Sequence, residues 1–286
     1  MSVNNSLVAK QRQKTSLTAY LTNDAVKDQI TKVVGGKDGQ RFMAAVISAV
    51  QTNPALQDCS NPSILSGALL GESLKLSPSP QLGHYYLVPF NDSKKGKVAQ
   101  FQLGYKGYIQ LAIRSGQYKK INVLAIKEGE LEYFDPLNEE IKINLMVDKW
   151  DEREATATIG YYAMFELNNG FRKAIYWSKK QMENHALKYS AGYKAKKGYT
   201  FWEKNFDMMA YKTMLRQLIS KWGIMSIELQ SAFERDMTFT DDSGKVNYVE
   251  VDEPEIVFEA DVVGDPQPQK TESSVNDVEA ALFGDR

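Results

Sequence analysis

The chain has 286 residues, of which 43% are hydrophobic and 25% charged, proportions typical of a globular protein with one large domain or two ordinary ones. A single cysteine, Cys59, excludes an internal disulfide, and with only two histidines the chain lacks the usual ligands of a structural zinc site. The N-terminus has no apolar signal-peptide segment, and no run of about 18 apolar residues occurs, so we expect a soluble, cytoplasmic protein.

The formal net charge of −1 conceals two segments of opposite sign. Residues 1–233 carry 31 basic and 21 acidic side chains, whereas residues 234–286 carry 4 basic and 15 acidic ones. A basic body followed by an acidic segment is typical of a protein that binds a polyanion and has a separate interaction region.

The N-terminal part is predicted to be helical. Residues 1–22 are polar and carry basic but no acidic side chains, which indicates a loose basic arm. Asn23 is placed to cap a helix that ends near Val34 before a glycine pair. Two further helices are expected at about residues 40–52 and 61–76.

The pattern then changes to strands. Residues 84–90 and 98–103 are extended and flank a turn with three lysines, which predicts a β-hairpin with a basic tip. The later elements are expected to be a helix at 105–115, strands from 118 to 143 broken at 135–136, a hairpin at 155–167 and 171–177, a helix from Ser178 to Tyr189, a loop at 190–199, a long helix at 201–222 and a last helix ending near 237. Without a βαβ repeat, this mixture predicts an α+β fold in which a small antiparallel sheet with a β-hairpin packs on helices.

Three groups of basic and aromatic residues are candidates for nucleic-acid binding. On the helix at 105–115, Lys106, Gln110 and Arg114 share one face, and Tyr118, Lys119 and Lys120 follow it. The alternative interpretation of this group is a solvated helix face and a turn.

The second group lies between residues 188 and 199, where lysines and tyrosines alternate without an acid. The candidates are Lys188, Tyr193, Lys194, Lys196, Lys197 and Tyr199. Lysines neutralise phosphates and tyrosine rings stack on unpaired bases, so this composition favours single-strand binding over a plain surface loop.

The third group is a basic stripe on the long helix, formed by Asn205, Lys212 and Arg216 along one border of its apolar face. Lys212 and Arg216 are four residues apart and repel each other, and an anion between them would reverse the sign of that interaction.

Two other functional classes are alternatives. Clustered carboxylates such as Glu128, Glu130, Glu132 and Asp135 could serve a metal-dependent nuclease, although an exposed strand and turn is the simpler interpretation. A structural protein that coats DNA without annealing it is the other alternative. The chain has no phosphate-binding motif of ATPases, so ATP-driven strand exchange is not supported.

Two sequence blocks resemble the RecT family of phage and prophage single-strand annealing recombinases. The first block reads LGHYYLVPF at residues 82–90, FQLGYKGYIQLA at 101–112 and RSG at 114–116. The second reads FW at 201–202, MLRQL at 214–218 and KWG at 221–223. The resemblance covers roughly residues 20–235.

The resemblance implies ATP-independent annealing of complementary DNA strands by rings or helical filaments of many copies. It also implies binding of single-stranded DNA and annealed duplex, a partner exonuclease, the host single-strand-binding protein and a cytoplasmic location in a bacterial host cell. It implies no catalytic or metal-ligating residue and no required cofactor, with Mg²⁺ at most a modulator. Lys106, Arg114, Lys212 and Arg216 lie in the matched blocks and become candidates for a DNA groove.

The domain organisation expected from these observations has three parts. Residues 1–22 form the arm, 23–235 the DNA-binding, annealing and oligomerisation domain, and 236–286 an acidic, mostly disordered tail. An amphipathic segment at 275–283 could dock a partner, or the tail could compete with DNA for the groove; a solubilising tail without further function is a third interpretation.

Overall fold

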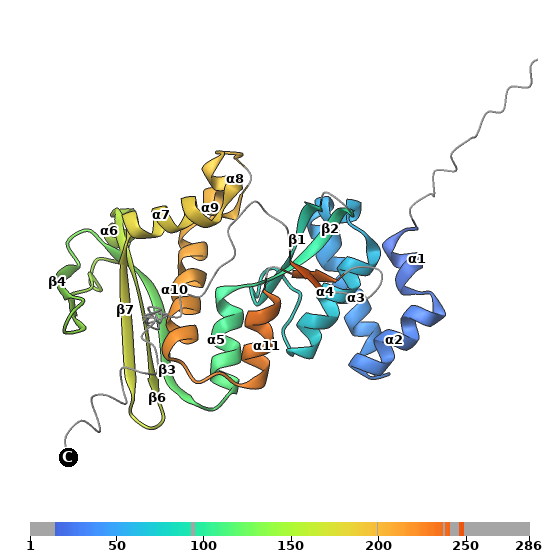
Figure 1. The fold of residues 1–286 in the computed structure, drawn as a ribbon, viewed down its shortest axis with the longest axis horizontal. Coiled ribbons are helices and arrows are strands. Elements are labelled where there is room, and N and C mark those ends of the chain that lie inside the picture. The colour runs from blue at the N-terminus through green and yellow to red at the C-terminus, as the bar shows by residue number, and fades with distance from the viewer. Residues whose placement is uncertain (1–14, 93–94, 199, 237, 241–245, 249–286) are drawn as a thin grey trace, which may run out of the picture. The chain divides into compact units, whose positions relative to one another are not determined.

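The structure is a computed structural model that describes residues 15–92, 95–198, 200–236, 238–240 and 246–248, all within one compact unit. Helices pack on antiparallel sheets, and the predicted α+β class is confirmed (Figure 1). The predicted tail lies outside the described residues except for its first few positions.

The N-terminal helices are α1 (Leu17–Leu21), α2 (Asp24–Val34), α3 (Gly39–Thr52), the 3₁₀ helix η1 (Pro54–Asp58) and α4 (Asn61–Ser73). As predicted, the side chain of Asn23 accepts a hydrogen bond from the Ala25 N–H and caps α2. Leu21, which falls in the predicted arm, is fully buried, so the end of that segment packs on the body.

The predicted hairpin is present as β1 (Tyr85–Asp92) and β2 (Gly96–Leu103), paired in antiparallel register from Tyr85 opposite Leu103. Helix α4 packs closely on it: a Cβ on Gly71 would lie 2.3 Å from the Tyr85 ring, so only glycine fits there. Strands β8 (Thr238–Thr240) and β9 (Val246–Tyr248), which the sequence did not predict, complete a sheet of order β1-β2-β8-β9.

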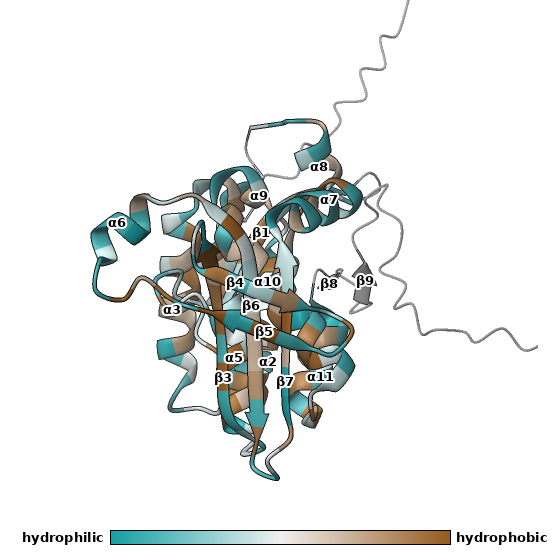
Figure 2. Cartoon of the chain, turned by 90° about the vertical axis from the view of Figure 1, so that its left-hand side faces the viewer, coloured by the Kyte–Doolittle hydropathy of each residue, from teal (hydrophilic) through white to brown (hydrophobic). Residues whose placement is uncertain are grey.

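Helix α5 (Tyr105–Arg114) leads into a second sheet of order β3-β6-β7. Its strands are β3 (Tyr118–Lys127), β6 (Thr158–Leu167) and β7 (Arg172–Ser178), and β6 and β7 form the predicted hairpin. The small hairpin of β4 (Leu131–Asp135) and β5 (Glu140–Ile143) lies across one face of this sheet (Figure 2). Helix α6 (Trp150–Ala155) follows it and was not predicted.

The C-terminal helices are α7 (Lys179–Tyr189), α8 (Ala191–Lys194), α9 (Phe201–Lys204), α10 (Phe206–Trp222) and α11 (Ile227–Arg235). Ser178 caps α7, as predicted, in a reciprocal capping box with Gln181. The predicted continuous helix over 201–222 is wrong: Asn205 has φ −143° and ψ 59°, which ends α9 before α10 begins. The break lets Trp202 turn into the core behind the β3-β6-β7 sheet.

Candidate nucleic-acid interface

A cleft lies between the two sequence blocks. A cavity of about 120 Å³ separates the β1–β2 hairpin and the start of α5 from α9 and the first turns of α10. Its lining residues are Tyr86, Gln102, Leu103, Gly104, Tyr105, Phe201, Asn205, Met208, Met209 and Lys212. Segments about 100 residues apart in the sequence therefore form the two walls of one cleft.

Aromatic side chains form much of its walls. The rings of Tyr86 and Phe201 face each other with centroids 6.1 Å apart, and Phe201 is exposed. Tyr105 packs edge-on against Tyr211 at 5.6 Å. Gly104 is required here, because a Cβ would lie 2.1 Å from the Gly83 carbonyl oxygen. The cleft thus offers the exposed ring of Phe201 beside partly buried tyrosine rings, and unpaired bases stack on rings of this kind.

One buried carboxylate joins the walls of the cleft. Asp236, at the end of α11, is fully buried and accepts hydrogen bonds from the Leu103 backbone N–H at 2.9 Å and the Tyr108 hydroxyl at 3.0 Å. On the other wall, Lys212 Nζ and an Arg216 guanidinium nitrogen each lie 3.0 Å from its carboxylate. We call these residues the Asp236 network.

This network corrects the predicted position of the basic stripe. Lys212 is only 7% exposed, and burial lowers its pKa although Asp236 opposes that shift. Burial would also lower the pKa of Arg216, but Tyr108 and Asp236 together raise it. An anion that offsets the repulsion between the two cations is present in the protein itself as the Asp236 carboxylate, and of the three stripe residues Asn205 is the exposed one at the cleft.

The α5 group is divided between surface and structural positions. Lys106 and Gln110 are exposed, as the helical spacing predicts. Arg114 is also exposed, but its guanidinium donates to the carbonyls of Leu74 at 2.5 Å and Lys75 at 3.0 Å and so satisfies the C-terminal end of α4.

The residues after α5 are largely occupied by contacts within the protein. Tyr118 is buried, its hydroxyl donates to the Ile224 carbonyl at 2.9 Å, and burial raises its pKa to about 12. Tyr118, a candidate for nucleic-acid binding in the sequence, thus has a structural position, because its ring packs on Phe165 inside the sheet core. Lys119 and Lys120 are exposed but share the carboxylate of Glu166.

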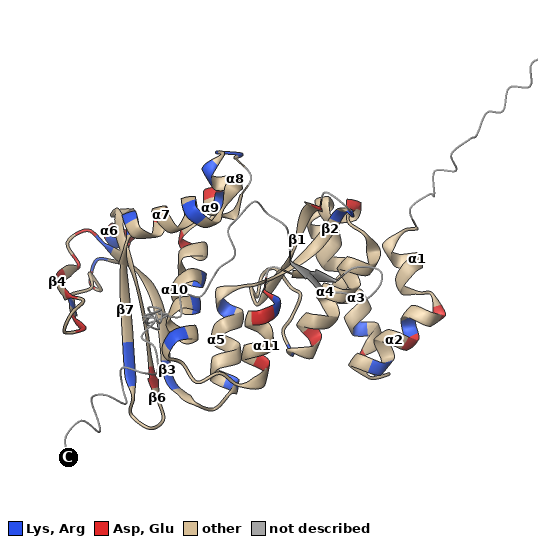
Figure 3. Ribbon diagram, in the orientation of Figure 1, with Lys and Arg blue, Asp and Glu red and all other residues tan. Residues whose placement is uncertain are grey.

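The lysine group between α7 and α9 is the one most open to solvent. Lys188, Lys194, Lys196 and Lys197 are exposed and form no ion pair with the described acidic residues. Basic positions, blue in Figure 3, gather at α8 and the turn after it. We call them the lysine segment. It leads directly to Phe201 in the cleft, whereas Tyr199 lies outside the described residues.

The core beneath the lysine segment is aromatic. Tyr193 is half-buried and its ring packs on Trp202 and Phe206, so it anchors the segment instead of facing solvent. His185 lies among Trp177, Tyr189 and Trp202. Burial, and to a smaller extent the positive charge of Lys188, lowers its pKa to about 4.

Sequence reasoning missed four residues of this site: Tyr86, Tyr105, Phe201 and Asp236. The first three fall in a predicted strand or helix, and period and propensity do not show which ring borders a cavity. Asp236 was assigned to the acidic tail, and the only signal was the uncompensated pair of cations on α10.

Three of the four carboxylates considered for a nuclease form contacts within the protein. Glu130 is buried against Arg153, with Nε 2.6 Å from Oε1; burial opposes its ionisation, but the hydrogen bonds from Arg153 keep its pKa low. Glu132 pairs with Lys142, and Asp135 accepts bonds within its own turn. Among the described residues, no group of three potential ligands could hold a metal ion.

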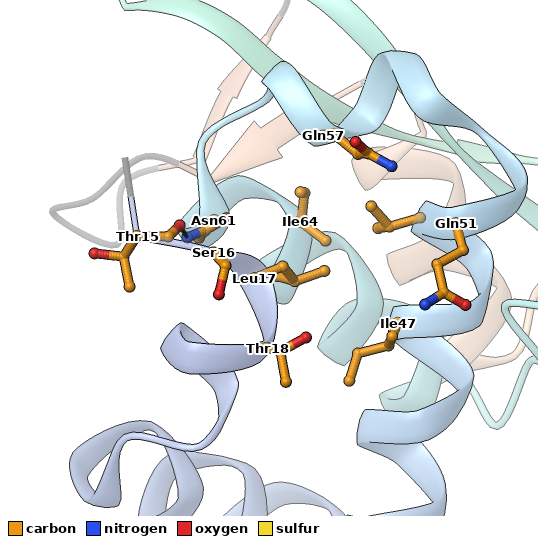
Figure 4. A pocket seen from close by; sticks show the side chains of 10 residues that line it. Thr15, Ser16, Leu17, Thr18, Ile47, Gln51, Gln57, Asn61 and Ile64 are labelled. Atoms are coloured by element: carbon orange, nitrogen blue, oxygen red, sulfur yellow. Dashed lines mark hydrogen bonds between the residues drawn. The ribbon is translucent and has the colours of Figure 1, made fainter. Parts of the chain in front are cut away.

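A larger cavity of about 300 Å³ lies between α1, α3 and α4 (Figure 4). Leu17, Ile47 and Ile64 project toward it, and the Asn61 amide donates to the Thr15 carbonyl at 2.8 Å. None of the described side chains that line it is charged, so it does not provide the electrostatics that phosphate requires. In the part of the chain that the structure describes, no helix is long and apolar enough to cross a bilayer.

Comparison with known proteins identifies the family. The sequence profile of the RecT family matches residues 40–250, which include both sequence blocks and both walls of the cleft. The chain belongs to the RecT family of single-strand annealing proteins. The resemblance inferred from the two blocks is confirmed.

Two relatives are similar to this chain over most of their length. The uncharacterized protein YqaK of Bacillus subtilis (strain 168) is 42% identical over 232 residues, covering 81% of this chain and 76% of the relative. Protein RecT of Escherichia coli (strain K12) is 27% identical over 229 residues, covering 78% and 81%.

Proposed function

We propose that this RecT-family protein binds single-stranded DNA at the cleft and the lysine segment and anneals complementary strands without ATP during phage or prophage recombination. The observation that carries the proposal is an aromatic cleft whose lining residue Phe201 follows closely in the chain after four exposed lysines that form no ion pair with a described acid. Lys106 and Gln110 are exposed on α5, the helix whose first residue lines the opposite wall of the cleft, and would add polar contacts to the bound strand.

The proposed mechanism is electrostatic. Two strands repel each other, and lysines that neutralise phosphates lower that barrier. Contacts to the backbone, with Phe201 or Tyr86 stacked on a base face, leave the Watson–Crick edges free for a second strand. Binding should therefore be independent of sequence. No step uses nucleotide hydrolysis, in line with the absence of an ATPase phosphate-binding motif.

The proposed partners follow from family membership. Many copies would act together as a ring or helical filament in the cytoplasm of the bacterial host, with an exonuclease that generates single strands and the host single-strand-binding protein. The tail after residue 235 would either compete with DNA or recruit a partner through residues 275–283. Tighter DNA binding after truncation supports competition, whereas lost recruitment with unchanged DNA binding supports docking.

An annealing assay tests the proposal. Two complementary oligonucleotides, one with a fluorophore and one with a quencher, should pair faster with protein than without, in the absence of nucleotide. The affinity for a single strand should fall with salt, with a log–log slope of about −0.7 per phosphate contact. DNA binding without faster pairing would indicate a coating protein, and shortened strands after incubation with Mg²⁺ would indicate a nuclease; either result contradicts the proposal.

A further inference from the structure

Exposed apolar side chains with acidic surroundings lie on the β4–β5 hairpin and on the segment that leads to α6. Tyr133 and Leu137 belong to the hairpin, where Leu137 at the turn is 87% exposed, whereas Val147 and Trp150 belong to the segment and the start of α6. Residues 128–154 carry ten acidic and three basic side chains, although the body as a whole is basic (Figure 3). We call this surface the acidic patch.

Buried contacts hold the acidic patch in place. Glu130 is fully buried, binds Arg153 of α6 and accepts the Met146 backbone N–H at 3.1 Å. Arg153 also donates to the Ala125 carbonyl of β3 at 2.7 Å. These contacts fix α6 and the preceding segment to the sheet, and Leu131, Ile141 and Ile143 pack the hairpin on the same sheet. Both groups of exposed apolar side chains are therefore carried by elements anchored to the sheet. Rigid apolar surfaces with polar rims commonly mark binding sites for other proteins.

A second apolar surface lies where α10 connects to α11. Its exposed side chains are Ile113, Ile224, Met225 and Ile227, and Ile227 is 86% exposed. The hydrogen bond from Tyr118 to the Ile224 carbonyl holds this connection beside the end of α5.

The flanks of the second surface are mostly basic. Lys75, Arg114 and Lys221 are exposed around it, and Glu228 is the acid at its border. Hydrogen bonds with a backbone N–H and with Ser226 lower the pKa of Glu228, and the nearby charges of Arg114 and Lys75 lower it further. We call this surface the basic patch.

We propose that the acidic patch of one copy binds the basic patch of the next copy. A DNA strand or the protein's own acidic tail would be repelled by the acidic patch, whereas the basic patch of a second copy matches it in both charge and apolar character. One pairing covers both exposed surfaces. Because two different surfaces meet, the contact is head-to-tail and continues into a ring or an open filament. The role of this assembly rests on the proposed function, because assembled copies would keep a bound DNA strand extended.

The test uses one double variant for each patch in the full-length chain. Leu137→Ser with Val147→Ser disrupts the acidic patch, and Ile113→Ser with Ile227→Ser disrupts the basic patch. All four side chains are exposed, so the fold should be retained, which circular dichroism checks. Each double variant alone should be monomeric by mass photometry, whereas the matched control Val33→Ser with Leu187→Ser should assemble like the parent protein.

Mixing the two double variants gives the decisive result. Each retains one intact patch, so an equimolar mixture should form dimers and no longer species. A mixture that stays monomeric, or double variants that assemble as the parent does, would overturn the proposal. If truncation after residue 248 abolishes assembly as fully as the patch variants do, the tail is the occupant of the basic patch and the proposal is wrong.

The same variants separate this proposal from the proposed function. Fluorescence anisotropy with a labelled single strand should show salt-dependent binding by both double variants, since neither changes the cleft or the lysine segment. Retained DNA binding with failed complementation overturns only the pairing of the patches. Parent protein that neither binds nor anneals DNA, with complementation intact, overturns only the proposed function.

Discussion

The Asp236 network and the lysine segment contain the same kinds of side chain but differ in what faces them. Lys212 and Arg216 lie beside a fully buried carboxylate, whereas Lys194, Lys196 and Lys197 form no ion pair with a described acid. The first set consequently holds elements of the protein together, and the second remains available to a polyanion. A cation's role in this protein is set by its nearest anion more than by its place in a sequence motif.

The largest expected effect comes from removing the anion of the Asp236 network. Asp236→Asn preserves shape but leaves two cations buried without a counter-charge, so we expect a loss of about 3–5 kcal/mol in the free energy of unfolding. Urea denaturation followed by fluorescence measures it. The control is Asp58→Asn, which breaks an exposed pair with Lys97 and should move the midpoint little. Equal urea midpoints for the two variants would show that the Asp236 charge does not stabilise Lys212 and Arg216, and both would again be candidates for phosphate contacts.

The second prediction removes the charges of the lysine segment. Replacing Lys194, Lys196 and Lys197 with Gln should weaken single-strand binding roughly 100-fold at low salt and reduce the salt slope by about 2, because about three phosphate contacts are lost. Stability should not change. The matched control replaces Lys27, Lys32 and Lys37, three exposed lysines of α2 and the following turn, and should bind normally. Equal loss in both triple variants would mean that overall charge, and not this segment, determines affinity.

These two sets also show what the sequence could predict. Alternation, caps and turn residues predicted most elements of the fold, including the helix that follows Ser178 and the hairpin that turns between residues 167 and 171, because these signals are local. The break at Asn205 and the burial of Lys212 depend on residues distant in the sequence, namely the core around Trp202 and Asp236 on α11.

The candidate site was predicted in part for the same reason. The exposed lysines were identified because a loop rich in Lys and Gly without acids stays at the surface whatever packs nearby. The aromatic cleft was not, because Tyr86 and Phe201 come from separate blocks and meet only after folding. A helical wheel shows which residues border an apolar face, but not whether another element, here α11, covers that border.

The third prediction concerns His185, in the aromatic core beneath the lysine segment. His185 has a pKa of about 4 in the folded protein and 6.5 in an unfolded chain, so between those pH values the unfolded state binds more protons. Stability should therefore decrease as pH falls from 6.5 to 4, by on the order of 2–3 kcal/mol from this residue. Urea midpoints at several pH values measure it, and His185→Phe should remove that part of the slope. An unchanged slope in the variant would assign the acid sensitivity to other groups.

The smallest effect is expected from a single ring in the cleft. Phe201→Ala removes an exposed ring that faces Tyr86, and the loss of one stacked base should weaken single-strand binding about tenfold without changing the salt slope. Phe171→Ala is the matched control, because this ring is also exposed but lies at the β6–β7 turn and does not line the cleft. Fluorescence anisotropy at two salt concentrations distinguishes a loss of base stacking from a loss of phosphate contacts, because only the second changes the salt slope. If Phe201→Ala behaves like Phe171→Ala, the bases do not enter the cleft, and the lysine segment alone would hold the strand through its phosphates.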